Sequence, residues 1–227
     1  MSGNKYDIVD MAEEAAEGII DTITFMSRIF YNASGISSLE QSMTKGSADR
    51  FKNRILKNID IWHLITDTQK KNFFDGLKDN PQNVNYLYEF FENIRTTMYE
   101  LHSKLLFRLL VNLVKNKGLT YFESNLLANI NTFNDEDIKI VYTFLKEYEN
   151  ENDDAQVKFN FNNFNYTNTF KKFIQIGIIA EMTGGLNFGK DVKKRNVPEF
   201  TYCYLTPNSK ELLIMLDDII GADDITI

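Results

Sequence analysis

Residues 82–116 contain neither proline nor glycine, and apolar side chains recur among them at three- and four-residue steps. Leu87, Ile94, Leu101 and Leu109 mark this pattern, which is the spacing of an α-helix with a buried face. Around 105–114 the apolar residues go nearly all round, so this segment is predicted to be the buried spine of a helical body. The pattern fits one long helix, or two helices that meet near 95–98.

Local signals mark the starts of further helices. Asp67 is suited to cap a short helix, and Asn80-Pro81 combines a cap with proline at the first helical position. Thr120 and Glu123 have the spacing of a capping box, and Asn134 precedes three acidic residues that favour the positive end of a helix dipole. Apolar stripes predict two more helices near the N-terminus, over 8–30 and 51–62.

The last quarter of the chain has a different pattern, in which helix and strand signals alternate. A short helix is predicted to stop at Gly177, and two strands are separated by Gly184-Gly185 and a basic loop. Helix, strand, hairpin, strand, helix is the outline of a winged helix. The expected elements are a helix over 166–175, strands over 178–181 and 201–206, and a final helix over 207–218. For 157–165, a strand and an irregular loop both remain open.

The predicted fold is therefore mainly α. A multi-helix body over 1–118 is followed by a winged-helix-like α+β subdomain over 119–227 that contains a β-hairpin. An acidic run near 149–155 is the expected link within this arrangement. The 227 residues are 43% hydrophobic and 25% charged, which is ordinary for a globular protein with a core.

Composition also narrows the classes of function. The single cysteine, Cys203, excludes an internal disulfide and any multi-cysteine zinc site. No second histidine or cysteine lies at ligand spacing from His63, and no metal or cofactor is expected. The N-terminus lacks the pattern of a secretory signal, and no apolar stretch is long enough to cross a bilayer. These features predict a cytoplasmic protein without a membrane partner. A net charge of −7 argues against a chain that wraps nucleic acid over its whole surface.

A local basic patch is nevertheless expected in the winged-helix-like region. Phe170, Phe173 and Ile174 share the predicted inward face of the 166–175 helix, and polar side chains share the outward face. Asparagine, glutamine and lysine on an exposed helix can contact bases and phosphates. The candidate nucleic-acid-binding residues are Asn168, Lys171, Lys172 and Gln175 on the helix, and Lys190, Lys193, Lys194 and Arg195 in the loop. The alternative is a module that binds protein, which the negative net charge favours.

A second candidate site pairs Arg95 with His102. Seven residues are nearly two helical turns, so both side chains would share one face of an unbroken helix. Imidazole can shuttle a proton near neutral pH, and guanidinium can stabilise phosphate charge. The arrangement resembles the signature of HEPN-type ribonucleases, which implies a metal-independent site at a dimer interface. The structural alternative is Arg95 paired with Glu92 or Glu100.

Four segments together resemble bacterial abortive-infection alpha (Abi-alpha)-type proteins. They are the leucine-rich run 105–116, the acidic helix start 135–138, the stretch 173–179, and Tyr204-Leu-Thr206. The resemblance covers about 100–217. It implies a helical front, a winged-helix ending and a cytoplasmic role in phage defence, with no established chemistry to transfer.

The expected function is that of a non-enzymatic interaction or regulatory protein. Its winged-helix-like module would bind a protein, a second copy of the chain, or nucleic acid. The ribonuclease that uses Arg95 and His102 is the alternative.

Overall fold

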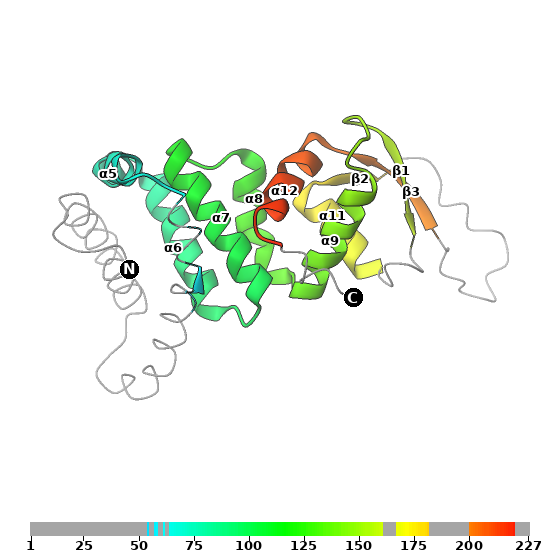
Figure 1. The fold of residues 1–227 in the computed structure, drawn as a ribbon, viewed down its shortest axis with the longest axis horizontal. Coiled ribbons are helices and arrows are strands. Elements are labelled where there is room, and N and C mark those ends of the chain that lie inside the picture. Colours follow the sequence, from blue (N-terminus) through cyan, green and yellow to red (C-terminus); the bar gives the residue numbers. More distant parts are fainter. Residues whose placement is uncertain are drawn as a thin grey trace. The chain divides into compact units, whose positions relative to one another are not determined.

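The computed structural model describes residues 54, 57–58, 61, 64–160, 167–181 and 200–220. The chain divides into two compact units, Met1–Asn131 and Thr132–Ile227, here the N-terminal and C-terminal units. In its described part the N-terminal unit is helical, whereas the C-terminal unit combines helices with a three-stranded antiparallel sheet (Figure 1). The predicted helical body and small α+β subdomain are therefore confirmed. The predicted helix over 8–30 and most of that over 51–62 lie outside the described residues.

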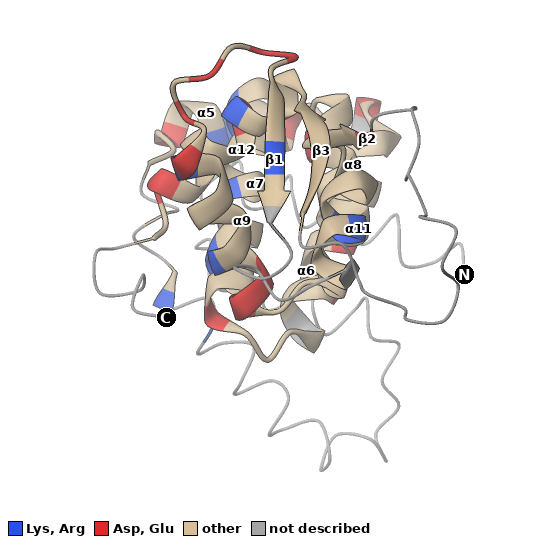
Figure 2. Ribbon diagram, turned by 90° about the vertical axis from the view of Figure 1, so that its right-hand side faces the viewer, with Lys and Arg blue, Asp and Glu red and all other residues tan. Residues whose placement is uncertain are grey.

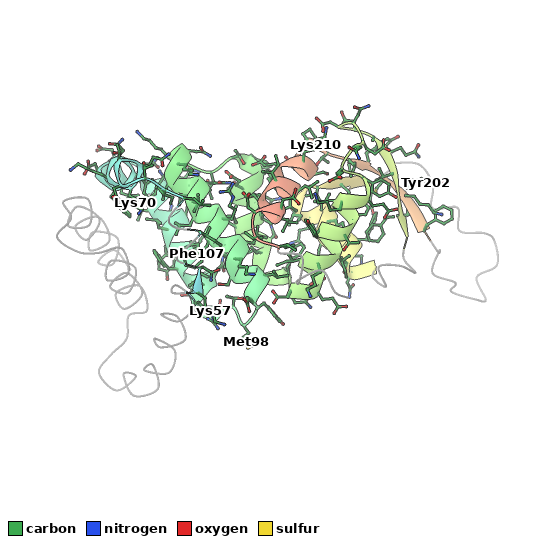
Figure 3. The ribbon with its side chains drawn as sticks, viewed as in Figure 1. Lys57, Lys70, Met98, Phe107, Tyr202 and Lys210 are labelled. Carbon is green, nitrogen blue, oxygen red and sulfur yellow. The ribbon has the colours of Figure 1, made fainter. Side chains whose placement is uncertain are left out.

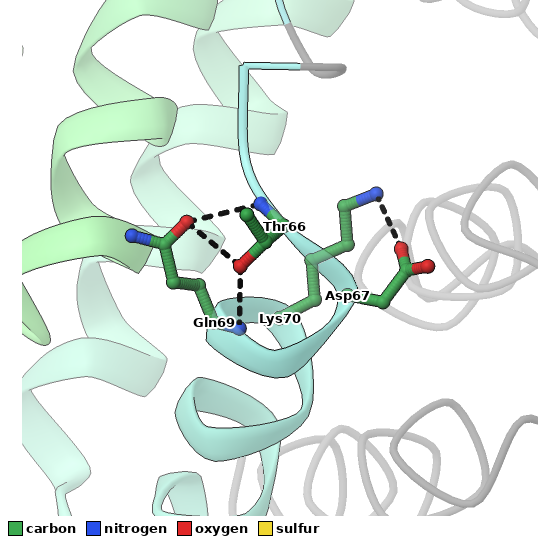
Figure 4. A network of polar contacts seen from close by, with 4 residues as sticks. All are labelled: Thr66, Asp67, Gln69 and Lys70. Carbon is green, nitrogen blue, oxygen red and sulfur yellow. Dashed lines mark hydrogen bonds and ion pairs between the residues drawn. The ribbon is translucent and has the colours of Figure 1, made fainter.

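Side chains of Thr66, Asn80 and Thr120 cap three of the helices that the structure describes in the N-terminal unit. Thr66 caps α5, because its side chain accepts from the Gln69 N–H and Gln69 Oε1 accepts from the Thr66 N–H (Figure 4). Asp67, the predicted cap, instead lies in the first turn, 3.3 Å from Lys70 Nζ. The elements are α5 (Asp67–Asp75), the 3-10 turn Leu77–Asp79, α6 (Pro81–Thr96), α7 (Glu100–Asn116), α8 (Tyr121–Asn129) and the 3-10 turn Ile130–Thr132.

The long apolar run is broken into α6 and α7 by an extended corner. Thr97 and Tyr99 take extended backbone angles, with ψ of 142° and 139°. Buried Thr97 holds this corner: its Oγ1 accepts from the Tyr99 N–H and lies 2.8 Å from Nδ1 of His102. Of the two arrangements that the sequence left open, the structure has two helices.

Helix α7 is the centre of the N-terminal unit. Its segment 105–114, which includes Phe107 (Figure 3), is buried nearly all round, as predicted. Phe107 packs edge-on against Phe90 of α6 with ring centroids 5.4 Å apart. Helices α5, α6 and α8 all contact α7. Asn93 of α6 also donates to the Leu127 carbonyl of α8 at 3.2 Å. Because α8 packs on α6 and α7, it belongs to this unit, and the division falls after Asn131 instead of after residue 118.

The C-terminal unit places its last strand in the middle of the sheet. In the order β1-β3-β2, both pairs are antiparallel, with Val157 opposite Cys203 and Ile179 opposite Leu205. The strand alternative for the start of 157–165 is therefore correct, and the two predicted hairpin strands pair. The elements are α9 (Asp135–Glu147), β1 (Gln156–Asn160), α11 (Thr167–Ile176), β2 (Ile179–Glu181), β3 (Phe200–Leu205) and α12 (Pro207–Asp217).

Phenylalanine rings fill the space between the sheet and its helices. Phe159 of β1 contacts Phe144 of α9 and both Phe170 and Phe173 of α11, with centroids 4.9–5.6 Å apart. Such tilted and edge-on pairs add to the large area that each ring buries. This cluster fixes which side of the sheet is the core, and therefore which side faces solvent.

The acidic run 149–155 is a turn inside the C-terminal unit. It connects α9 to β1, and its end is tied to β3: the Asp154 N–H donates to the Leu205 carbonyl at 3.1 Å, and the Leu205 N–H donates to the Ala155 carbonyl at 2.9 Å. The segment that was expected to be a link is thus hydrogen-bonded to strand β3. Asp154 has a φ of 65°, a conformation that asparagine and aspartate tolerate better than most residues.

Gly177 ends α11 in a left-handed conformation, with φ of 79°. Its carbonyl accepts from Thr206 Oγ1 at 2.6 Å and from Asn208 Nδ2 at 2.9 Å, which joins the end of α11 to the start of α12. An added Cβ would lie 3.3 Å from Asn208 Nδ2. The backbone angle therefore favours glycine here, and the neighbouring amide would have to shift slightly to admit a Cβ.

We expect Gly177→Ala to lower the free energy of unfolding by about 1–2 kcal/mol, because alanine is strained in this backbone conformation. Urea denaturation followed by circular dichroism measures the loss. Gly118→Ala is the matched control, since its Cβ would meet nothing within 4 Å and its φ is not in that region. Equal stability of the two variants would contradict the interpretation.

Candidate functional site

The outward face of α11 is the part of the predicted nucleic-acid site that the structure describes most fully. Asn168, Lys171 and Gln175 are exposed, and their spacing of three and four residues puts them in one stripe along the helix. Phe170, Phe173 and Ile176 are buried on the opposite side. We call Asn168, Lys171 and Gln175 the α11 stripe.

Lys172, which was predicted with these residues, has an internal partner. Its Nζ lies 2.6 Å from Oδ2 of Asp137, and its side chain is 23% exposed while that of Asp137 is 8% exposed. Thr169 Oγ1 donates to the other carboxylate oxygen at 3.2 Å. The Lys172 charge is therefore compensated within the unit, and its ammonium positions α11 against the start of α9.

Asp137 serves two elements at once. Its backbone N–H donates to the Asn134 side chain, and its carboxylate accepts from the Asn134 N–H at 3.0 Å, which completes the capping box of α9. The same carboxylate receives Lys172 and Thr169 from α11. The acidic start of α9 was evident in the sequence. The ion pair between Asp137 and Lys172 was not, because the two residues are 35 positions apart.

The other four candidates, Lys190, Lys193, Lys194 and Arg195, lie outside the described residues. They belong to the segment that connects β2 to β3. Their proposed contact with nucleic acid stays a prediction. Among the described residues of the C-terminal unit, acidic side chains outnumber basic ones, and several gather in the turn before β1 (Figure 2). A phosphate backbone would meet mostly unfavourable charge there.

The second candidate pair does not share a helix. Arg95 lies in the last turn of α6 and His102 in the first turn of α7, so the reasoning from helical spacing fails at the corner between them. His102 is only 2% exposed, and its Nδ1 contacts Thr97 Oγ1. A general acid or base must come within hydrogen-bond reach of its substrate, and this burial is unfavourable for RNA access.

A polar cluster outside both candidates ties α9 to α12. Tyr142 donates to Asp217 at 3.0 Å, and Lys146 lies within 3.0 Å of carboxylate oxygens of both Asp217 and Glu149. Burial and the Asp217 carboxylate raise the pKa of Tyr142. Hydrogen bonds to Glu149 and Asp217 raise the pKa of Lys146. Both shifts favour the protonated, structural form and neither prepares a group for catalysis.

In the described part of the chain, no three histidine, cysteine or acidic residues are grouped to hold a metal. Nor is any described helix both long and apolar enough to span a bilayer. No protein-family model, curated protein or solved structure matches the chain. The interpretation of the site therefore depends on its own residues.

We expect the Asp137–Lys172 pair to be energetically coupled. Asp137→Ala should cost more stability than Lys172→Met, because it removes a cap acceptor and leaves an ammonium partly buried without its partner. In a double-mutant cycle measured by urea denaturation, the coupling should be about 1–2 kcal/mol. Lys171→Met on the exposed stripe is the matched control and should change stability by less than about 0.5 kcal/mol. Additive effects at 137 and 172 would show that the contact contributes nothing.

The lone thiol should be inert in the folded protein. Cys203 is fully buried on β3, and burial raises the pKa of its thiol to about 12. A thiol-specific chromogenic reagent at about pH 8 should label it only after denaturation, since the thiolate is the nucleophile. Because the folded-state pKa is the higher one, the protonated thiol stabilises the fold below the ordinary value of 9.0, and this contribution is lost as the pH rises toward 12. Cys203→Ala should therefore lose stability less steeply above pH 9 than the parent chain.

Proposed function

We propose that this protein is a non-enzymatic interaction protein whose C-terminal unit is a winged-helix-like module. The order of α9, β1, α11 and the β2–β3 pair, with β3 in the centre of the sheet, supports this assignment. In that arrangement α11 immediately precedes the β2–β3 hairpin. The helix at this position of a winged helix is the one that contacts the partner. The proposed contact surface is the α11 stripe.

The observation that carries the proposal is the rigid presentation of this stripe. The inward side of α11 is fixed by the phenylalanine cluster, and the Asp137–Lys172 pair fixes the helix against α9. Two amides and one ammonium then face outward. These groups supply several hydrogen-bond donors and two carbonyl acceptors, but no nucleophile or acid–base pair. Such a surface is suited to binding and not to turnover.

A protein is the favoured class of partner. Lys171 is the single cation of the stripe, since Lys172 is engaged by Asp137, and acidic side chains outnumber basic ones among the described residues of the C-terminal unit. Nucleic acid binding needs several lysine or arginine contacts to phosphate. Placement in the cytoplasm and in phage defence is part of the proposal, motivated by the lone buried cysteine and by the Abi-alpha resemblance.

The ribonuclease alternative receives less support. Its histidine is buried beside Thr97, and the helix that would align it with Arg95 is broken at 97–99. In contrast, the α11 stripe is exposed and lies on one continuous helix. The binding proposal therefore rests on the more accessible of the two candidate sites.

Site-specific photo-crosslinking tests the proposal. A photoreactive residue replaces Lys171 in the full-length chain, expressed in the cells that make the native protein. We expect one discrete crosslinked species that is sensitive to protease and resistant to nuclease, because the stripe faces outward from a fixed helix. The matched control carries the same residue at Tyr121, which is 89% exposed on α8, and should not give that species.

Two results would count against this function. Loss of the crosslinked species after nuclease treatment would assign the stripe to nucleic acid. Identical products from positions 171 and 121 would mean that no specific partner is held at α11.

A further inference from the structure

The solvent face of the sheet carries a row of aromatic side chains. Phe200, Tyr202 and Tyr204 occupy alternate positions on β3, so they project from one face, and they are 39%, 48% and 38% exposed. Cys203 and Leu205, between and after them, point to the buried side. Figure 3 shows Tyr202 directed away from the body of the unit. We call these three residues the aromatic row.

This row lies on the central strand, and the side chains of the neighbouring strands leave much of Tyr202 and Tyr204 exposed. Lys158 and Gln156 of β1 stand opposite Tyr202 and Tyr204, and Ala180 of β2 also stands opposite Tyr204. Other exposed aromatic residues of the described chain, such as Tyr88 and Tyr121, lie on separate helices. Clustered tyrosine and phenylalanine are typical of protein interfaces, where they bury area at a small entropic cost.

Opposite charges lie toward the two ends of this face. Near Phe200 the Lys158 ammonium sits 4.0 Å from the ring centroid. Beyond Gln156, at the Tyr204 end, lies the acidic turn with exposed Glu151 and Asp154 (Figure 2). Along the strand direction, this face therefore carries the Lys158 ammonium at one end, the aromatic row in the middle, and the carboxylates of Glu151 and Asp154 at the other end.

We propose that this face binds the same face of a second copy of the chain. In a two-fold dimer each contact occurs twice with the roles exchanged, so a self-complementary surface is required. A two-fold axis that lies between the two sheets, parallel to them and perpendicular to β3 at the level between Tyr202 and Tyr204, brings Lys158 of each copy toward the acidic turn of the other. The aromatic rows then meet at the centre, at the spacing of about 10 Å typical of stacked sheets.

The edge of the sheet is less suited to this association. Strand β1 is an edge strand, and the Tyr148 hydroxyl donates to the Lys158 carbonyl at 2.7 Å. This side chain occupies a backbone acceptor that an added strand would need. Face-to-face packing leaves that contact intact. The inference is independent of the α11 stripe, because it uses different residues on a different element.

Sedimentation velocity of the full-length chain over a range of concentrations tests the dimer. We expect a reversible monomer–dimer equilibrium with a dissociation constant of roughly 1–100 µM, as suits a small interface. Tyr202→Ser should weaken it at least about tenfold, because a central aromatic residue is lost. Tyr121→Ser, the same change at a more exposed tyrosine, should leave the dissociation constant unchanged.

A charge-exchange pair tests the geometry. The first variant is Lys158→Glu, and the second combines Glu151→Lys with Asp154→Asn, which keeps a residue suited to the φ of 65°. Each variant alone should be monomeric where the parent chain dimerises, since like charges meet twice. An equimolar mixture should form a one-to-one heterodimer, because both contacts then join opposite charges. Circular dichroism confirms that each variant is folded.

The proposal is overturned if the parent chain is monomeric at all concentrations, if Tyr202→Ser dimerises as the parent does, or if the mixed variants fail to associate. A monomeric chain that binds a single-stranded oligonucleotide through Tyr202 would assign the aromatic row to nucleobase stacking, and would equally overturn it.

Discussion

The Asp137 carboxylate connects the secondary structure of the C-terminal unit to its tertiary packing. It accepts from the backbone N–H of Asn134, the residue that caps α9, and receives Lys172 and Thr169 from α11. A carboxylate near a helix N-terminus is already stabilised by the helix dipole, so it can hold a partly buried ammonium without extra compensation. Together with the phenylalanine cluster, this group sets the orientation of α11, and with it the direction in which Asn168, Lys171 and Gln175 point.

The sheet divides the unit into a closed side and an open side. On the closed side, Val157, Phe159 and Cys203 contribute to a core of phenylalanine rings from α9 and α11. On the open side, Phe200, Tyr202 and Tyr204 are partly exposed to solvent. The solvent face of an antiparallel strand usually carries polar residues at such positions. The same alternation along β3 thus generates both the stability of the unit and an exposed surface that a stable monomer does not need.

Structural features that depend on residues close together in the chain were predictable from the sequence. The capping boxes at Thr120 and Asn134 form because each needs only a neighbour three positions away. The β2 and β3 strands and the α11 faces followed from periodicity. Long-range pairings were not predictable: the pairing of Lys172 with Asp137 and the pairing of β1 with β3 join residues whose contact no local pattern encodes. The corner at Thr97 is local, since His102 is five positions away, but the apolar spacing continues through it and fits one helix as well as two. The exposed aromatic row was missed for a related reason, since its exposure depends on which strands and helices pack on each face of β3.

The central place of β3 also sets an order of events during synthesis. Strands β1 and β2 leave the ribosome first, yet neither pairs with the other, and both wait for residues 200–205 to supply their hydrogen bonds. Until then Val157, Phe159 and Ile179 lack the strand that completes their side of the core. Pairing between distant segments is slow, and nascent chains with unpaired edges are prone to associate wrongly. A chain that terminates before residue 200 would therefore lose the whole sheet and not one strand of it.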